Sequence, residues 1–283
     1  GDAKTQAANF AAQIALAPNQ TLPPALDIEV TEGKSAAQLE QWIEEFTSEL
    51  KRLTGRTPMI YTYKYFWMGQ MNNSQKFSDM PLWLAAYQDQ APEAVGGWNE
   101  LSFWQRSGSG KVAGISTDVD MNLFNGSKQQ LRSFSDGNYV DVGGALEQLV
   151  VSDGLDLSSD STPLIGAILA LAAGLIAIPQ LADAAEKSGL DPEAAEGLAA
   201  FVKTLQDKDA LPVEDLGDMA KGNFSVSDLA ILLDNAGHVN NVKSGNVSES
   251  EVSEAKNAAK NAGADVPDFD AGQVATLLNR VLQ

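Results

Sequence analysis

Two acidic residues that stand two positions apart are the first feature of the sequence that could carry chemistry. Asp27 and Glu29 lie in residues 25–30, ALDIEV, a short apolar run typical of a buried strand. Side chains two apart on a strand point to the same face, so both carboxyl groups would share one site. Repulsion and partial burial raise the pKa of one such acid, which can then protonate a glycosidic oxygen. The alternative is a strand that ends in solvent with two exposed acids.

The rarity of other reactive side chains narrows the chemistry further. The chain has no cysteine and a single histidine, His238, far from the first half. Disulfides, thiolate nucleophiles and sulfur-based zinc sites are therefore excluded, as is a Ser-His-Asp or Cys-His device in the first half. Acid–base chemistry in the first half has to rest on carboxylates, tyrosine or lysine.

Aromatic and amide side chains accumulate where further strands are expected to end. They are Tyr61, Tyr63, Trp83, Tyr87, Trp104 and Gln105. The flat C–H faces of sugar rings stack on aromatic rings, and sugar hydroxyls need polar partners, so carbohydrate clefts favour this mixture. For each aromatic residue alone, packing in the core is the competing interpretation. Their shared location favours a saccharide groove.

The elements that would position these residues alternate between strand and helix. The patterning predicts helices at 9–17, 36–53 and 127–134, and strands at 25–30, 59–63, 82–87, 102–105 and 119–124. Such alternation favours an α/β fold with a mainly parallel sheet and catalytic residues at the carboxyl ends of the strands, as in βα barrels. The later strands lack long helices between them, so the barrel would be irregular.

The composition changes near residues 135–138, which divides the chain into residues 1–136 and 137–283. Aromatic residues become rare, and the formal charge is −3 up to residue 135 and −16 beyond it. The second part is expected to be all-helical, with helices at 145–151, 164–188, 192–205, 227–236, 250–262 and 271–282. Its acidity, and the lack of a basic stripe, argue against nucleic acid as a partner.

Three local motifs favour structural interpretations. Residues 108–111, GSGK, fail the phosphate-loop pattern and predict a hairpin turn. Residues 164–178 are apolar but too short for a typical membrane span, which favours a buried helix, with membrane contact as the alternative. Residues 240–251 resemble a calcium loop but lack carboxylates at its first three ligand positions.

Five motifs together resemble glycoside hydrolase family 25, the family of bacterial and phage N-acetylmuramidases. They are LPPALDIEV at 22–30, TGRTPMIYTY at 54–63, PLWLAAY at 81–87, FWQ at 103–105 and VDMNLFNGS at 119–127, in the family's order and approximate spacing. The resemblance covers about residues 1–134. It implies a lysozyme that cleaves the β-1,4 bond between N-acetylmuramic acid and N-acetylglucosamine in peptidoglycan, without a metal or organic cofactor.

The resemblance also implies roles for individual residues. Glu29 would be the general acid. Asp27 would be its companion, which either supports the substrate's acetamido group as nucleophile or stabilises charge at the anomeric carbon. Asp120 is preferred to Asp118 as a further active-site acid, because the matching Asn122 follows it by two. The sugar groove would be lined by Tyr61, Tyr63, Trp83, Tyr87, Trp104, Gln105 and Asn122.

One departure from the family pattern sets a further expectation. Family members begin with three more strands, the first with another active-site Asp, and nothing here corresponds to them. We therefore expect an incomplete TIM-like barrel. The chain starts Gly1-Asp2-Ala3 without a visible signal peptide, while the substrate would place the protein outside the cell or at the wall. A peptidoglycan-binding or structural module that does not cut is the alternative function.

Overall fold

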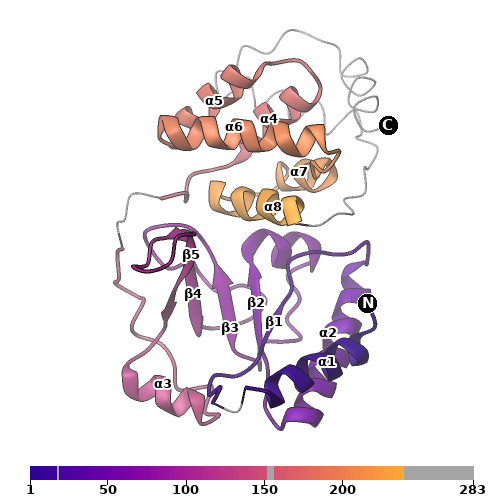
Figure 1. Ribbon diagram of the computed structural model, residues 1–283, viewed down its shortest axis with the longest axis vertical. Coiled ribbons are helices and arrows are strands. Elements are labelled where there is room, and N and C mark those ends of the chain that lie inside the picture. The colour runs from indigo at the N-terminus through magenta and orange to yellow at the C-terminus, as the bar shows by residue number, and fades with distance from the viewer. Residues whose placement is uncertain (18, 152–155, 239–283) are drawn as a thin grey trace. The chain divides into compact units, whose positions relative to one another are not determined.

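The computed structural model describes residues 1–17, 19–151 and 156–238, with the side chain of His238 left out (Figure 1). It divides into two compact units, Gly1–Asp153 and Gly154–Gln283. The division falls later than the sequence analysis placed it. The residues that follow Ser135 stay with unit 1, because Gly143 N donates to Asn125 O at 2.7 Å and Val151 N donates to Asp89 O at 2.9 Å.

Unit 1 is a mixed α/β fold built on one five-stranded sheet. The strands are β1 (Ala25–Asp27), β2 (Met59–Tyr63), β3 (Leu82–Ala85), β4 (Phe103–Gly110) and β5 (Val119–Phe124), and they are neighbours in sequence order. β1 to β4 run parallel, and β5 runs antiparallel to β4. All five predicted strands are present, although β1 ends at Asp27 rather than at residue 30, β3 ends at Ala85 rather than at residue 87, and β4 continues to Gly110 rather than ending at residue 105.

The helices of unit 1 begin and end where local sequence favours it. They are α1 (Ala3–Ala15), α2 (Ala36–Thr54), the π-helix η1 (Phe66–Gln70) and α3 (Lys128–Ser135). α2 begins with a capping box of Ser35 and Gln38 and ends at Gly55, whose φ of 72° suits glycine. α1 packs along α2 (Figure 1). The helix expected at 145–151 was wrong, because that segment consists of bends, turns and an isolated bridge between Val150 and Gln90.

Strand alternation gives the sheet two different faces. One face carries the buried side chains Leu26, Ile28, Ile60, Leu82, Leu84 and Trp104. The opposite face carries Asp27, Tyr61, Trp83 and Phe103, which are paired in register across β1 to β4 and are half-buried or exposed. We call this second face the open face. It holds the residues that the sequence singles out for chemistry.

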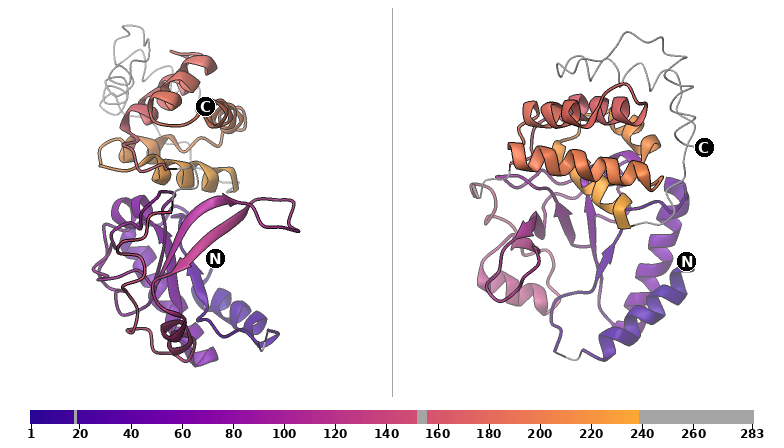
Figure 2. Two further views of the ribbon diagram at one scale, coloured as in Figure 1. Left: turned by 90° about the vertical axis from the view of Figure 1, so that its left-hand side faces the viewer. Right: turned by 45° about the horizontal axis from the view of Figure 1, so that its top comes forward.

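The β4–β5 hairpin extends beyond the rest of the sheet (Figure 2, left). Residues 111–118 at its tip are all exposed, and an ion pair between Lys111 and Asp118 joins the two sides of the tip. Gly108 and Gly110 belong to β4 itself, and Gly110 pairs with Val119. The segment with the GSGK sequence is therefore the end of a strand and the start of a hairpin loop, as the sequence predicted.

The described part of unit 2 is helical. Its helices are α4 (Thr162–Ala172), α5 (Ile178–Lys187), α6 (Pro192–Asp207), α7 (Val213–Met219) and α8 (Val226–His238). The single helix expected at 164–188 is two helices, since Gly174 takes a φ of 72° and Pro179 begins the next helix. Residues 164–172 are all buried, as expected of a core helix. No helix in the described ranges has the length and apolarity needed to span a membrane. The features expected at 240–251, 250–262 and 271–282 lie outside the described residues.

Candidate active site

The acid pair lies at the carboxyl end of β1. Asp27 is the last residue of the strand, and Glu29 follows two residues later with a buried Oε1. Protein atoms around the Asp27 carboxyl group raise its pKa by desolvation, although the side chain also reaches water. A hydrogen bond with Glu29 opposes this and lowers the pKa of Asp27. The two carboxyl groups therefore lie within hydrogen-bonding reach of each other, so the pair can share one proton.

Tyr61 and Trp83 continue the open face next to the pair. The parallel register sets Asp27 beside Tyr61, and Tyr61 beside Trp83. The rings of Tyr61 and Trp83 meet edge to face with their centroids 4.9 Å apart. Trp83 Nε1 donates to Asn122 Oδ1 at 2.9 Å, which fixes the indole from the side of β5. The structure thus brings these predicted residues together on one surface.

The hydroxyl of Tyr61 lies among the other polar residues of the site. It donates to Gln105 Oε1 at 2.8 Å, and Tyr87 donates to the same oxygen at 3.2 Å. The pKa of Tyr61 is raised far above its usual range, first by desolvation and then by Glu29, Tyr87, Asp27 and Asp120. Tyr61 therefore stays neutral and acts as a hydrogen-bonding group rather than as a base.

β5 completes the site from the side opposite β1. Asp120 and Asn122 are exposed residues on this strand. Gly108 on β4 lets the strands approach closely, because a Cβ added there would lie 3.0 Å from Tyr87 Oη and 3.7 Å from Asp120 Oδ1. The sequence analysis missed this close approach. The signal available was a glycine where strand β4 was expected to have ended.

Three of the predicted groove residues are buried, namely Tyr63, Trp104 and Gln105. Trp104 is fully buried, and its Nε1 donates to Ala86 O at 2.8 Å. Consecutive residues of a strand point to opposite faces, so Trp104 and Gln105 could not both line one groove. Tyr63 is also fully buried, with its ring against Tyr65 and Phe66. Trp104 is therefore a core residue on the other face of the sheet, whereas Tyr63 is buried on the same face as Tyr61, and its place in the groove stays a prediction.

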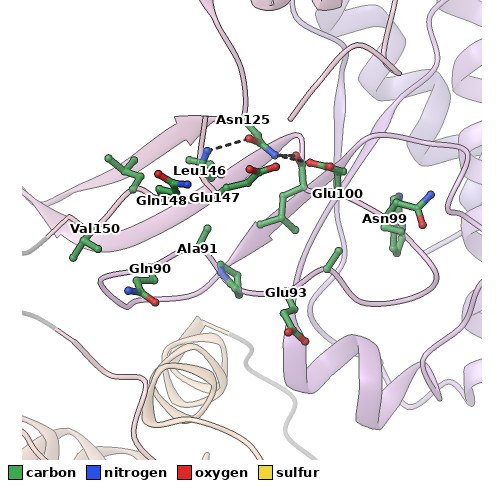
Figure 3. A pocket seen from close by; sticks show the side chains of 15 residues that line it. Gln90, Ala91, Glu93, Asn99, Glu100, Asn125, Leu146, Glu147, Gln148 and Val150 are labelled. Carbon is green, nitrogen blue, oxygen red and sulfur yellow. Dashed lines mark hydrogen bonds between the residues drawn. The ribbon is translucent and has the colours of Figure 1, made fainter. Parts of the chain in front are cut away.

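A separate pocket of about 490 Å³ lies elsewhere in unit 1 (Figure 3). Its walls are residues 90–94, 98–101 and 146–150 together with Asn125. Asn125 Nδ2 donates to Glu100 Oε2 at 3.1 Å, and Asn125 Oδ1 accepts from Leu146 N at 3.3 Å. None of the residues predicted for the active site lines this pocket, so it is distinct from the acid pair.

The raised pKa of Asp27 predicts a pH-dependent effect of replacing it. Below pH 3.8 the carboxyl is protonated in both the folded and the unfolded chain, so Asp27→Asn should leave the free energy of unfolding unchanged. As the pH rises through the raised folded-state pKa, the parent chain loses stability that the variant retains. The gain at pH 7 should not exceed about 1 kcal/mol, because the group reaches water.

This difference is measured by urea unfolding at pH 3 and at pH 7. Trp42, Trp67, Trp83, Trp98 and Trp104 are the chain's five tryptophans and all lie in unit 1, so their fluorescence reports that unit. If Asp27→Asn is instead less stable than the parent at pH 7, the folded protein stabilises the ionised form of Asp27, and desolvation does not dominate its pKa.

Comparison with known proteins finds similarity to one family. Residues 1–115 match the model of Glycosyl hydrolases family 25. Lysozyme M1 of Streptomyces globisporus is 38% identical over 122 residues, which are 40% of this chain and 41% of that protein. The N,O-diacetylmuramidase of Arthroderma benhamiae is 35% identical over 124 residues, 41% of this chain and 51% of that protein.

A solved structure, the bacterial lysozyme from Streptomyces coelicolor, has 30% identity, with 49% of this chain and 68% of that chain covered and a TM-score of 0.44. The chain spans about 41% of the length of lysozyme M1. Asp27, Glu29, Tyr61, Trp83 and Gln105 lie inside the matched segment, whereas Asp120 and Asn122 follow it. Over residues 1–115 the chain is therefore similar to glycosyl hydrolases family 25.

Proposed function

We propose that unit 1 is an N-acetylmuramidase, which hydrolyses the β-1,4 bond between N-acetylmuramic acid and N-acetylglucosamine in peptidoglycan. The observation that carries the proposal is the hydrogen-bonded pair of Asp27 and Glu29 on the open face, beside Tyr61 and Trp83. The match of residues 1–115 to the family model supports it, as do the relatives named as lysozyme and muramidase.

The pair supplies what hydrolysis of a glycosidic bond needs. Glu29 donates its proton to the leaving glycosidic oxygen as the bond to the anomeric carbon breaks. Asp27, ionised, either orients the substrate's acetamido group as nucleophile or stabilises the positive charge that grows at that carbon. Water adds to the carbon and gives up a proton, which restores the acid. Asp120 contributes further negative charge from β5. The proposal needs no metal or organic cofactor.

The aromatic residues of the open face would hold the saccharide. Trp83 is half-buried, and its indole is fixed by Tyr61 and Asn122, so one face can stack on a sugar ring without further ordering. Tyr87 is also half-buried and lies close to Gly108 and Asp120. Since its Oδ1 accepts from the Trp83 indole, Asn122 contributes to binding chiefly by orienting that ring.

We further infer that the sheet is an arc of an irregular TIM-like βα barrel. β1 to β4 are parallel and adjacent in sequence order, and α2 connects β1 to β2. The acid pair lies at the carboxyl end of β1, and Gln105 is the register partner of Ala85, the last residue of β3, so both lie where βα barrels carry their catalytic groups. The open face would then be the inner face of the barrel.

A peptidoglycan-binding module without catalysis is the second candidate. In the described sheet β1 has β2 as its one strand neighbour, so the acid pair stands at the sheet's edge. A site open on that side could hold a glycan and still admit too much water for efficient proton transfer. Under either function the partner is peptidoglycan, and the protein acts outside the cell or at the cell wall.

Product analysis separates the two candidates. The full chain is incubated with purified sacculi, the products are reduced with borohydride, and their end groups are identified by mass spectrometry. Muramidase action should create new reducing ends that are N-acetylmuramic acid. New N-acetylglucosamine ends, or an absence of new ends with the chain bound to the sacculi, would contradict the proposal.

A further inference from the structure

One amide oxygen binds both phenols of the site. Gln105 is buried, with 3% of its surface exposed, and its Oε1 accepts from Tyr61 at 2.8 Å and from Tyr87 at 3.2 Å. These three residues come from β2, from the segment after β3 and from β4, so the oxygen ties three parts of the sheet together. A buried amide with two charge-neutral donors on one oxygen has a fixed orientation.

This arrangement fixes the direction of the Tyr61 proton. A phenol has a single proton to donate, and Tyr61 gives it to Gln105. Glu29, Tyr87, Asp27 and Asp120, which come from both sides of β2, are close enough to raise the pKa of Tyr61 electrostatically. Asp27 is the register partner of Tyr61 on β1, and its side chain lies on the same face. The oxygen of Tyr61, rather than its proton, is therefore available to the acids.

Removing the amide oxygen would change which group receives that proton. The Tyr61 hydroxyl is part-buried, so once it loses Gln105 it turns to the best remaining acceptor. Carboxylates are stronger acceptors than neutral oxygens, and the neighbouring carboxyl groups are those of Asp27, Glu29 and Asp120. A phenol that donates to a carboxylate stabilises its ionised form. The pair of Asp27 and Glu29 would then hold its shared proton less firmly.

We propose that Gln105 is a positioning residue that holds the hydroxyl proton of Tyr61 away from the Asp27–Glu29 pair, so that the pair keeps its own proton. Gln105 acts through Tyr61 and does not contact the reacting atoms. The catalytic meaning of the arrangement rests on the proposed muramidase function, whereas the direction of the proton does not. The two can therefore be tested separately.

The primary test follows the titration of the pair itself in the full chain. The carboxyl ¹³C resonances of Asp27 and Glu29 are followed with pH by NMR, with Asp27→Asn and Glu29→Gln used for assignment. In Gln105→Met the pair should lose its proton about one pH unit lower than in the parent, because the phenol now stabilises the ionised form. An unchanged titration would overturn the proposal.

Two further variants control for general damage to the fold. Gln70 also bonds a tyrosine in unit 1, with its Nε2 donating to Tyr65 Oη at 2.9 Å, and it lies outside the site. Gln70→Met should leave the titration unchanged. Gln105→Glu keeps an accepting oxygen and adds negative charge, so the titration should move to higher pH, opposite to Gln105→Met. A shift in the same direction for both Gln105 variants would contradict the proposal.

A double-mutant cycle shows whether the effect passes through Tyr61. In the Tyr61→Phe chain there is no hydroxyl proton to redirect, so adding Gln105→Met should cause no further shift. A shift that persists there would assign the effect to something other than Tyr61. If the parent chain cuts sacculi, the alkaline limb of the pH profile of kcat should move to lower pH in Gln105→Met, by the same amount as the NMR titration of the pair. If the parent chain does not cut them, the proposed function fails while the NMR titration still decides the role of Gln105.

Discussion

Replacing Glu29 with glutamine is expected to slow the hydrolysis of peptidoglycan by about a thousandfold, within the range for loss of a general acid. Glutamine keeps the shape of the side chain but has no carboxyl proton to give. Because the hydrogen bond to Asp27 can still form, the free energy of unfolding should change little. The rate is measured as the clearing of suspended bacterial walls by the full chain.

Glu32→Gln is the matched control for this variant. Glu32 is three residues further along the chain, exposed, and paired with Lys34 and the N-terminal amine. The Glu32→Gln substitution removes one negative charge without changing the acid pair. The rate of wall clearing should therefore stay within about twofold of the parent, as expected for a surface charge. Equal clearing by the Glu29→Gln and Glu32→Gln chains would end the assignment of Glu29.

The second large effect concerns Trp83 and Trp104, the two tryptophans that were both predicted to line the groove. Trp104→Ala should lower the free energy of unfolding by about 3–5 kcal/mol, because it empties a fully buried site and leaves Ala86 O without its donor. Trp83→Ala should cost far less stability, because its ring is half-buried. It should instead raise KM roughly tenfold, by the loss of one stacking surface.

Urea unfolding and steady-state kinetics on both variants separate these roles. The pair is matched in residue type and lies on adjacent strands, and it differs in the face of the sheet that each side chain occupies. If Trp83→Ala proves the more destabilising of the two, or if Trp104→Ala folds normally but binds substrate poorly, the assignment of faces is wrong.

The order and approximate positions of the strands in unit 1 could be predicted from the sequence. Each strand is a short apolar run, and the segments between the runs carry helical periodicity or turn-forming residues. The alternation rule alone placed Asp27 and Glu29 on one face, and the register adds Tyr61 beside them. The same rule excludes Trp104 from the face of Gln105, so that error came from grouping aromatic residues by position without applying strand parity.

Other features depend on contacts that no local pattern encodes. The bonds from Tyr61 and Tyr87 to Gln105 join residues 44 and 18 positions apart. The end of unit 1 depends likewise on the bond from Gly143 to Asn125, which attaches residues of polar, glycine-rich composition to the sheet. The helix expected at 145–151 followed its apolar spacing, but the segment is held instead by the Asn125 side chain, which accepts from Ala145 N and Leu146 N. Tertiary bonds outweighed the local pattern there.

The central claim is that the open face, with its acid pair, is where a glycan strand is held and cut. The most direct test is a crystal structure of the full chain with Glu29→Gln in complex with a tetrasaccharide of alternating N-acetylglucosamine and N-acetylmuramic acid. The account predicts a sugar ring against Trp83 and a glycosidic oxygen within hydrogen-bonding distance of the side chain at position 29. A tetrasaccharide bound instead in the pocket around Glu100 and Asn125, or absent from the open face, would contradict it.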